Sequence, residues 1–102
     1  MTHILERMIK KAQSSPCRYK VAAVAFDKKG SIIAYSNNKK RFNRPGGGVH
    51  AEMRLMLQYG VNIKTILICR ASKTGILHRM DPCEACARKA DELGIRIVSI
   101  VD

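Results

Sequence analysis

The sequence has no long hydrophobic stretch. No run of about 18 or more apolar residues occurs in its 102 residues, so no transmembrane helix is expected. The N-terminus, MTHILERMIKKAQ, lacks the apolar stretch of roughly 7–15 residues that a secretory signal requires. Internal repeats, low-complexity tracts and linkers are also absent. These absences predict a single domain over residues 1–102, no membrane partner and a cytoplasmic location.

Acidic residues are scarce. The chain has 19 Lys and Arg against 8 Asp and Glu, which gives a formal net charge of +11. The imbalance is uneven, because residues 1–48 hold 11 basic and 2 acidic residues whereas residues 49–102 hold 8 and 6. Such asymmetry favours a polyanionic partner or substrate, and a merely soluble basic surface is the alternative.

The chain contains four cysteines, Cys17, Cys69, Cys83 and Cys86. Without a secretory signal they are expected to be reduced thiols rather than two disulfides. Two of them form a CxxC pair, for which metal binding or redox chemistry is the better interpretation. Cys69 ends an apolar run and is expected in the core, and Cys17 is expected in a loop.

Hydrophobic periodicity predicts seven elements in the order α-β-β-α-β-α-β. The expected helices cover 3–13, 49–59 and 82–93, and the expected strands cover 20–26, 31–37, 65–69 and 95–101. Asp81 is expected to cap the last helix, with Pro82 as its first residue. Because helices alternate with strands in the second half, its two strands should be parallel, with helices packed on the sheet.

Two short motifs stand at the predicted starts of helices. His50 and Glu52 open one helix, and Cys83 and Cys86 lie in the first turn of the next. If the two helix starts converge, the His and the two Cys supply three zinc ligands, and Glu52 stands just outside them. Three ligands leave a coordination position for water, which indicates a catalytic rather than a structural zinc. A fourth ligand from His78 would make the site structural.

These residues, His50-Ala51-Glu52 and Pro82-Cys83-Glu84-Ala85-Cys86, resemble the zinc-binding motifs of the cytidine deaminase superfamily. The resemblance covers most of the chain and implies an α/β fold, a three-layer α-β-α core with a mixed sheet of about four strands. It also implies one Zn²⁺ per chain, bound by His50, Cys83 and Cys86, with Glu52 as the catalytic proton shuttle. Because the predicted order ends at its fourth strand, one sheet edge is expected to be open or covered by a second copy in a homo-oligomer.

Further roles follow from the same resemblance. Asn37 matches the family residue that contacts the sugar or base, and the backbone N–H groups of Ala51 and Cys83 are expected to hold the base's carbonyl side. The segment around Cys83 looks less like the tRNA adenosine deaminases, which favours cytosine over adenine as the substrate base. The implied reaction is hydrolytic deamination of cytosine to uracil.

The substrate class is predicted from the charge. A basic run precedes His50 and mixes cations with one aromatic ring, which suits single-stranded DNA or RNA; its members are Lys39, Lys40, Arg41, Phe42 and Arg44. Two alternatives stay open: a deaminase of free cytidine, deoxycytidine or dCMP, and a zinc-stabilised nucleic-acid-binding module without catalysis. Glu52 argues against the last, because a structural zinc site has no use for an acid outside its ligands.

Overall fold

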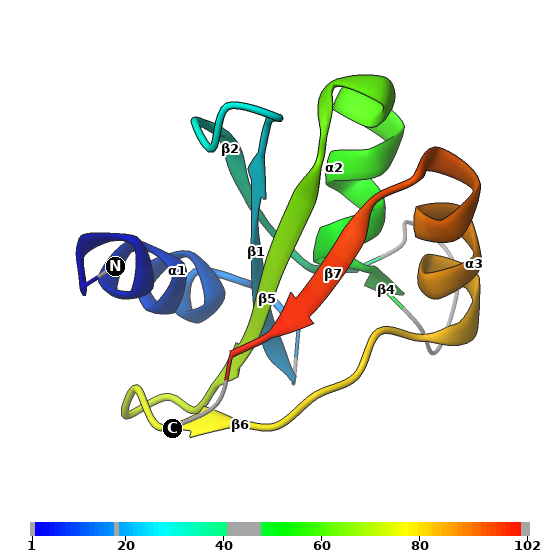
Figure 1. Cartoon of the computed structure of the whole chain (residues 1–102). Coiled ribbons are helices and arrows are strands. Elements are labelled where there is room, and N and C mark those ends of the chain that lie inside the picture. Colours follow the sequence, from blue (N-terminus) through cyan, green and yellow to red (C-terminus); the bar gives the residue numbers. More distant parts are fainter. Residues whose placement is uncertain (1, 18, 41–47, 101–102) are drawn as a thin grey trace.

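The computed structural model describes residues 2–17, 19–40 and 48–100, which are shown in Figure 1. Its elements are α1 (Thr2–Gln13), β1 (Lys20–Phe26), β2 (Ile32–Asn37), β3 (Lys39–Lys40), β4 (Gly48–Val49), α2 (Ala51–Tyr59), the 3₁₀ turn η1 (Gly60–Asn62), β5 (Thr65–Ala71), β6 (Leu77–His78), α3 (Glu84–Leu93) and β7 (Arg96–Ser99). The predicted order of the seven main elements is confirmed. No helix in these ranges is long and apolar enough to cross a membrane.

The main sheet is mixed, with five strands. Its order is β2-β1-β5-β6, and β7 pairs with the same strand β5. The first half of β5 lies parallel to β7, as the alternation of helices and strands predicts, and its last two residues lie antiparallel to β6. A separate two-stranded ribbon, β3 with β4, leads from the end of β2 to the start of α2. The expected mixed sheet is therefore confirmed, with β6 as an additional short strand.

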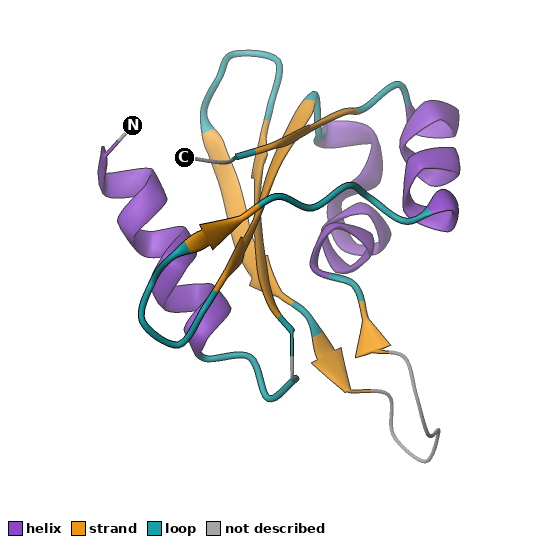
Figure 2. Cartoon of the chain, turned by 90° about the horizontal axis from the view of Figure 1, so that it is seen from below, coloured by secondary structure: helices purple, strands orange, loops and turns teal. Residues whose placement is uncertain are grey.

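Helices cover both faces of this sheet. Figure 2 shows α1 on one face and α2 with α3 on the other, which confirms the three-layer α-β-α fold. Side chains of β5 alternate between the layers: Ile66 and Ile68 pack with α2 and α3, whereas Cys69 packs with α1. Both layers are therefore needed to bury the central strand, as its continuous apolar run indicates.

The segment 70–80, which lies between the expected strand 65–69 and the expected helix 82–93, is partly strand. β5 continues to Ala71, and a tight turn returns the chain as β6. The Ser72 hydroxyl stabilises the turn by accepting the backbone N–H groups of Thr74 and Ile76. Gly75 completes it with φ of +88°, a left-handed conformation that glycine adopts without strain. Ser72 and Gly75 were the local signals for this hairpin.

The start of α3 also differs from the expectation. Cys83, rather than Asp81, is the N-cap, and its Sγ accepts the backbone N–H of Cys86. Asp81 is exposed and lies 3.9 Å from Arg79, so its carboxylate does not serve as a cap. A sulfur atom replaces the usual oxygen cap because the cysteines must turn toward the end of the helix. Cys83 and Cys86 are therefore the N-cap and the third helical residue, not the second and fifth.

We expect the packing of β5 to dominate stability. Ile68→Ala removes a fully buried side chain from the layer shared with α2 and α3, and should lower the free energy of unfolding by about 2–5 kcal/mol. Ile76→Ala, at a side chain 59% exposed, should change it by less than about 0.5 kcal/mol. Urea unfolding of the two variants measures both changes in the free energy of unfolding. Equal decreases in the two variants would contradict the assignment of Ile68 to the buried layer.

Candidate metal and catalytic site

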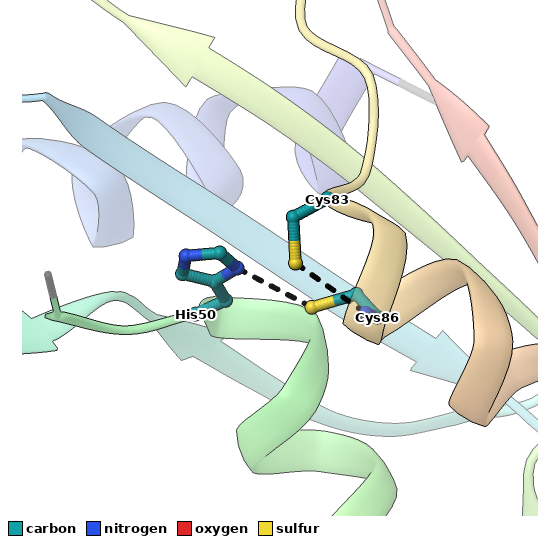
Figure 3. A group of neighbouring side chains, drawn as sticks. All are labelled: His50, Cys83 and Cys86. Atoms are coloured by element: carbon teal, nitrogen blue, oxygen red, sulfur yellow. Dashed lines mark hydrogen bonds between the residues drawn. The ribbon is translucent and has the colours of Figure 1, made fainter.

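Three potential metal ligands meet between the first turns of α2 and α3. They are His50, Cys83 and Cys86, and Figure 3 shows their side chains turned toward one another. The Nδ1 atom of His50 lies 3.3 Å from the Sγ atom of Cys86, and the three ligand atoms all lie within 4.8 Å of one another. The predicted convergence of the two motifs is therefore observed.

The local backbone explains why these side chains point beyond the helix ends. His50 is the N-cap of α2 in an extended conformation (φ −69°, ψ 146°), and its ring makes no capping hydrogen bond. Cys83 has a similar extended backbone (φ −67°, ψ 163°) at the N-cap of α3. An N-cap side chain lies over the open end of its helix. Two such caps, facing each other, place an imidazole nitrogen beside two sulfur atoms.

The donor set and its spacing fit zinc. One imidazole nitrogen and two sulfurs are zinc ligands, and tetrahedral bonds of about 2.0–2.3 Å separate neighbouring donors by roughly 3.5 Å. The 3.3 Å separation of Nδ1 and Sγ is close to that value. His78 lies on β6 opposite Arg70 and is not a member of the cluster. Within the described ranges the cluster thus offers three ligands, the number found in catalytic zinc sites.

Glu52 lies in the first turn of α2, beside this cluster. Its side chain is 1% exposed, and no hydrogen bond of regular geometry reaches either carboxylate oxygen from the residues the structure describes. Burial raises the pKa of the Glu52 carboxyl above its ordinary value; the backbone N–H of Glu52, then His50 and then the adjacent Cys86 thiol oppose the rise. An unpartnered buried carboxylate is costly, so it points to an interaction with something that the site binds.

Cys86 shares this environment. It is 1% exposed, and burial raises the pKa of its thiol, with the negative charge of Glu52 and then Cys83 raising it further. Two groups that become anions are therefore held close together away from water. A divalent cation at the three donors would offset both charges and favour the thiolates that bind zinc. The residues present fit the metal.

A second group of polar residues holds the start of α2, and sequence reasoning missed it. The buried hydroxyl of Ser36, on β2, donates to the backbone carbonyl of Ala51, between His50 and Glu52. One turn further along α2, Arg54 donates to the backbone and side-chain oxygens of Asn37, at 2.8 and 3.0 Å. These contacts fix α2 to the end of β2. Their only sequence signal is the place of Ser36 and Asn37 at the end of a strand.

The Asn37 side chain is engaged by α1 and α2. Its amide nitrogen donates to the Lys11 carbonyl and to the Ser14 hydroxyl, while its amide oxygen accepts from Arg54. The side chain therefore ties the end of α1 to α2. Its expected contact with the sugar or base stays a prediction.

The backbone groups expected to hold the base lie at the cluster. Ala51 is the first residue of α2, where backbone N–H groups have no acceptor within the helix, and Cys83 supplies one of the sulfurs. Their roles as substrate donors likewise stay predictions.

The basic run before His50 is described only in part. Lys39 is exposed and pairs with Val49 across the β3–β4 ribbon, directly beside the residue that precedes His50. Lys40 belongs to the same ribbon, opposite Gly48. Arg41, Phe42 and Arg44 lie outside the described residues. The ribbon thus carries Lys39 to the neighbourhood of the metal cluster, while contacts of the run with nucleic acid stay a prediction.

Comparison with known proteins agrees with the fold and with the cluster. A family model described as "Cytidine and deoxycytidylate deaminase zinc-binding region" matches residues 1–102. No curated protein sequence gives a significant match.

Solved structures with a similar fold include two bacterial cytidine deaminases. The Burkholderia pseudomallei enzyme has a TM-score of 0.66 at 18% identity, covering 98% of this chain and 86% of that one. The Mycobacterium leprae enzyme has a TM-score of 0.63 at 17% identity, covering 93% and 83%. The dCMP deaminase of cyanophage S-TIM5 has a TM-score of 0.58 at 21% identity, covering 97% and 85%.

The ligand assignment predicts a specific pattern of metal loss. Purified protein should carry about one zinc per chain, and Cys83→Ser or Cys86→Ser should lose it together with much of the thermal stability, because metal binding is coupled to folding. Cys17→Ser, outside the cluster, should keep the metal. Elemental analysis and melting curves measure this. A zinc-free native protein, or equal loss in Cys17→Ser, would refute the assignment.

Proposed function

The chain belongs to the family of the cytidine and deoxycytidylate deaminase zinc-binding region, and from this we propose that it hydrolyses cytosine to uracil with release of ammonia. The proposal assigns the zinc ligands to His50, Cys83 and Cys86, and the proton-transfer role to Glu52. The observation that carries it is the buried, unpartnered Glu52 carboxylate beside a cluster of three ligands. A zinc site that served structure alone would have a fourth ligand and no such acid.

Each residue has a defined task in this reaction. Zinc bound by His50, Cys83 and Cys86 would supply a water molecule of lowered pKa as the nucleophile for C4 of the base. Glu52 takes one proton from that water and delivers it to the ring nitrogen, then takes the second proton from the hydroxyl added to C4 and delivers it to the departing amino group. One water is consumed, the C4–N bond breaks and ammonia leaves, so the carboxylate ends in its starting state. Because Glu52 is buried, the carboxylate exchanges these protons with the substrate rather than with bulk water.

Replacement of this carboxylate should separate catalysis from structure. Glu52→Gln removes the proton acceptor but no metal ligand, so turnover should fall by about 10²–10⁴-fold while zinc content is retained. Glu84→Gln, at an exposed acid in the first turn of α3, should keep wild-type turnover. Uracil formation measured by mass, with metal analysis on the same samples, tests this. Substantial deamination by Glu52→Gln would exclude the mechanism.

We propose cytosine in single-stranded DNA or RNA as the substrate. Support comes from the excess of +9 in residues 1–48 and from the ribbon that carries Lys39 beside the residue preceding His50. A polynucleotide offers a row of phosphates to such cations, and an unpaired base can enter the pocket while its neighbours stack outside.

A free nucleoside or nucleotide is the second candidate. The specific observation in its favour is the family description, which names cytidine and deoxycytidylate, together with the named activities of the similar structures. Under this alternative the basic residues meet one phosphate at most, or serve assembly of a homo-oligomer.

A comparison of substrates distinguishes the two candidates. Wild-type protein should deaminate a single-cytosine oligonucleotide faster than cytidine or dCMP, with binding that weakens steeply as salt rises. Lys39→Ala should reduce the slope of log affinity against log salt by about 0.7, the value of one phosphate contact on a single strand. Lys64→Ala, an exposed cation beside the start of β5, is the control. Fast dCMP turnover without salt-sensitive oligonucleotide binding would establish the second candidate instead.

A further inference from the structure

A cavity lies at the end of the sheet near β6, apart from the three metal ligands. Its volume is about 120 Å³, and its lining residues are Tyr19, Lys20, Arg70, Ala71, Ser72, Lys73 and His78. That volume is well below the roughly 300 Å³ or more of a pocket for a drug-sized ligand. The cavity therefore suits a small polar group rather than a whole nucleoside.

The described lining of this cavity is basic. Three of its residues are Lys20, Arg70 and Lys73, and none of the described residues that line it is an acid. Among the described residues, the carboxylates that form ion pairs do so with Arg79 and Arg88, not with these three. A concave surface that gathers cations without carboxylates favours an anion.

Two of the cations are held in place before any ligand arrives. The guanidinium of Arg70 lies over the ring of Tyr19, 4.4 Å from its centroid. The Lys20 ammonium donates to the backbone carbonyls of Ser15 and Cys17, at 2.6 and 3.4 Å, which leaves one of its three donors for another acceptor. A fixed Arg fork and a fixed ammonium recognise phosphate oxygens at a low entropic cost.

The cavity lies at the same end of the sheet as the metal cluster. The end of β2, the start of β1 and the end of β5 meet there, because Asn37 pairs with Ala22 and Lys20 with Ala71. Ser36, beside that end of β2, holds the start of α2. The chain leaving β6 runs to the start of α3, as Figure 1 shows.

Strand alternation places part of the cavity on the face that carries the zinc ligands. Arg70 follows Ile66 and Ile68, which pack with α2 and α3, and His78 pairs directly with Arg70. From β2 to β6 there are three strand spacings of about 4.8 Å, or roughly 14 Å. The cations are spread over that width, from Lys39 beyond β2 to the cavity at β6. A single phosphate group cannot contact all of them.

We propose that this cavity binds the phosphodiester of a nucleotide flanking the reacting cytidine, so that the strand runs along the end of the sheet while one base enters the metal site. The inference rests on the proposed deaminase function and names residues outside the basic run before His50. Arg70 and Lys73 provide the charge of the phosphate site. Tyr19, 55% exposed, lies under the Arg70 guanidinium and holds it at this site.

The test uses zinc-loaded full-length protein and a labelled oligothymidylate, which contains no cytosine and so reports backbone binding alone. Lys73→Gln, on an exposed turn, should reduce the slope of log affinity against log salt by about 0.7, which is about fivefold in affinity at 0.1 M salt. The double variant Arg70→Gln/Lys73→Gln should lose about 1.4 in slope and roughly 25-fold in affinity. Lys28→Gln/Lys29→Gln removes the same charge from the exposed turn at the opposite end of the sheet and should change neither.

Activity measurements identify the source of the phosphate. In the double variant, kcat/KM for a single-cytosine oligonucleotide should fall at least fivefold more than kcat/KM for dCMP. Unchanged oligothymidylate binding by Lys73→Gln, or equal loss in the Lys28/Lys29 control, overturns the proposal. A rise in KM for dCMP with oligonucleotide binding intact assigns the cavity to a free nucleotide and overturns it too. Failure of the wild type to form uracil from any substrate rejects the deaminase function, whereas the binding comparison still decides the cavity.

Discussion

The site depends on one packing constraint: α2 and α3 lie on the same face of β5 with their first turns at the same end of that strand. α2 enters β5 through η1, and α3 follows its far end, so both helices run against the strand direction. Ala51 and Cys86 belong to the same buried cluster as Ile68 of the central strand. Because the N-caps His50 and Cys83 and the first-turn residue Cys86 supply the ligands, a shift of either helix would separate His50 from the two sulfurs. The hydrogen bonds from Ser36 and Arg54 to neighbouring backbone oppose such a shift.

This arrangement buries two groups that can become anions, the Glu52 carboxyl and the Cys86 thiol, and the described residues around them do not neutralise the charge. Glu52 and Cys86 are both about 1% exposed; burial raises the pKa of each, and the charge of Glu52 raises the pKa of the Cys86 thiol further. Domains of this size are stable by about 5–15 kcal/mol, and binding of a structural zinc contributes about 10–16 kcal/mol in small peptides. A divalent cation at the cluster therefore has a free energy comparable with the whole stability of the domain. Under the proposed mechanism the metal ligands serve the fold as well as the chemistry, whereas Glu52 serves only the chemistry.

Local signals made the fold and the metal cluster predictable. Strand and helix periodicity, the turn glycines, and the spacing of His50, Glu52, Cys83 and Cys86 all lie within short stretches of sequence. One feature that escaped prediction depends on contacts distant in sequence, and two depend on local side-chain hydrogen bonds that hydrophobic periodicity does not report. Asn37 joins α1 to Arg54 of α2, a role that no local pattern encodes. The cap of α3 was misassigned because Asp81 and Pro82 satisfy the usual cap rules, yet the cluster requires Cys83 at that position. In the β5–β6 hairpin, two residues of pairing depend on the Ser72 side chain rather than on hydrophobic alternation.

The charge distribution connects recognition to stability. The chain carries +11, and the described ion pairs, Arg79 with Asp81 and Arg88 with Glu84, join exposed side chains and contribute little. Self-repulsion of so many cations destabilises the compact state. A polyanion laid along the end of the sheet would relieve that repulsion between Lys39, Lys20 and Arg70, so its binding free energy adds to the stability of the folded chain. The phosphate of a mononucleotide would neutralise only the cation that it contacts, and the repulsion among the other cations would remain. The charge distribution is thus consistent with the proposed extended substrate, whereas the proposed chemistry rests on the buried Glu52 beside the ligand cluster.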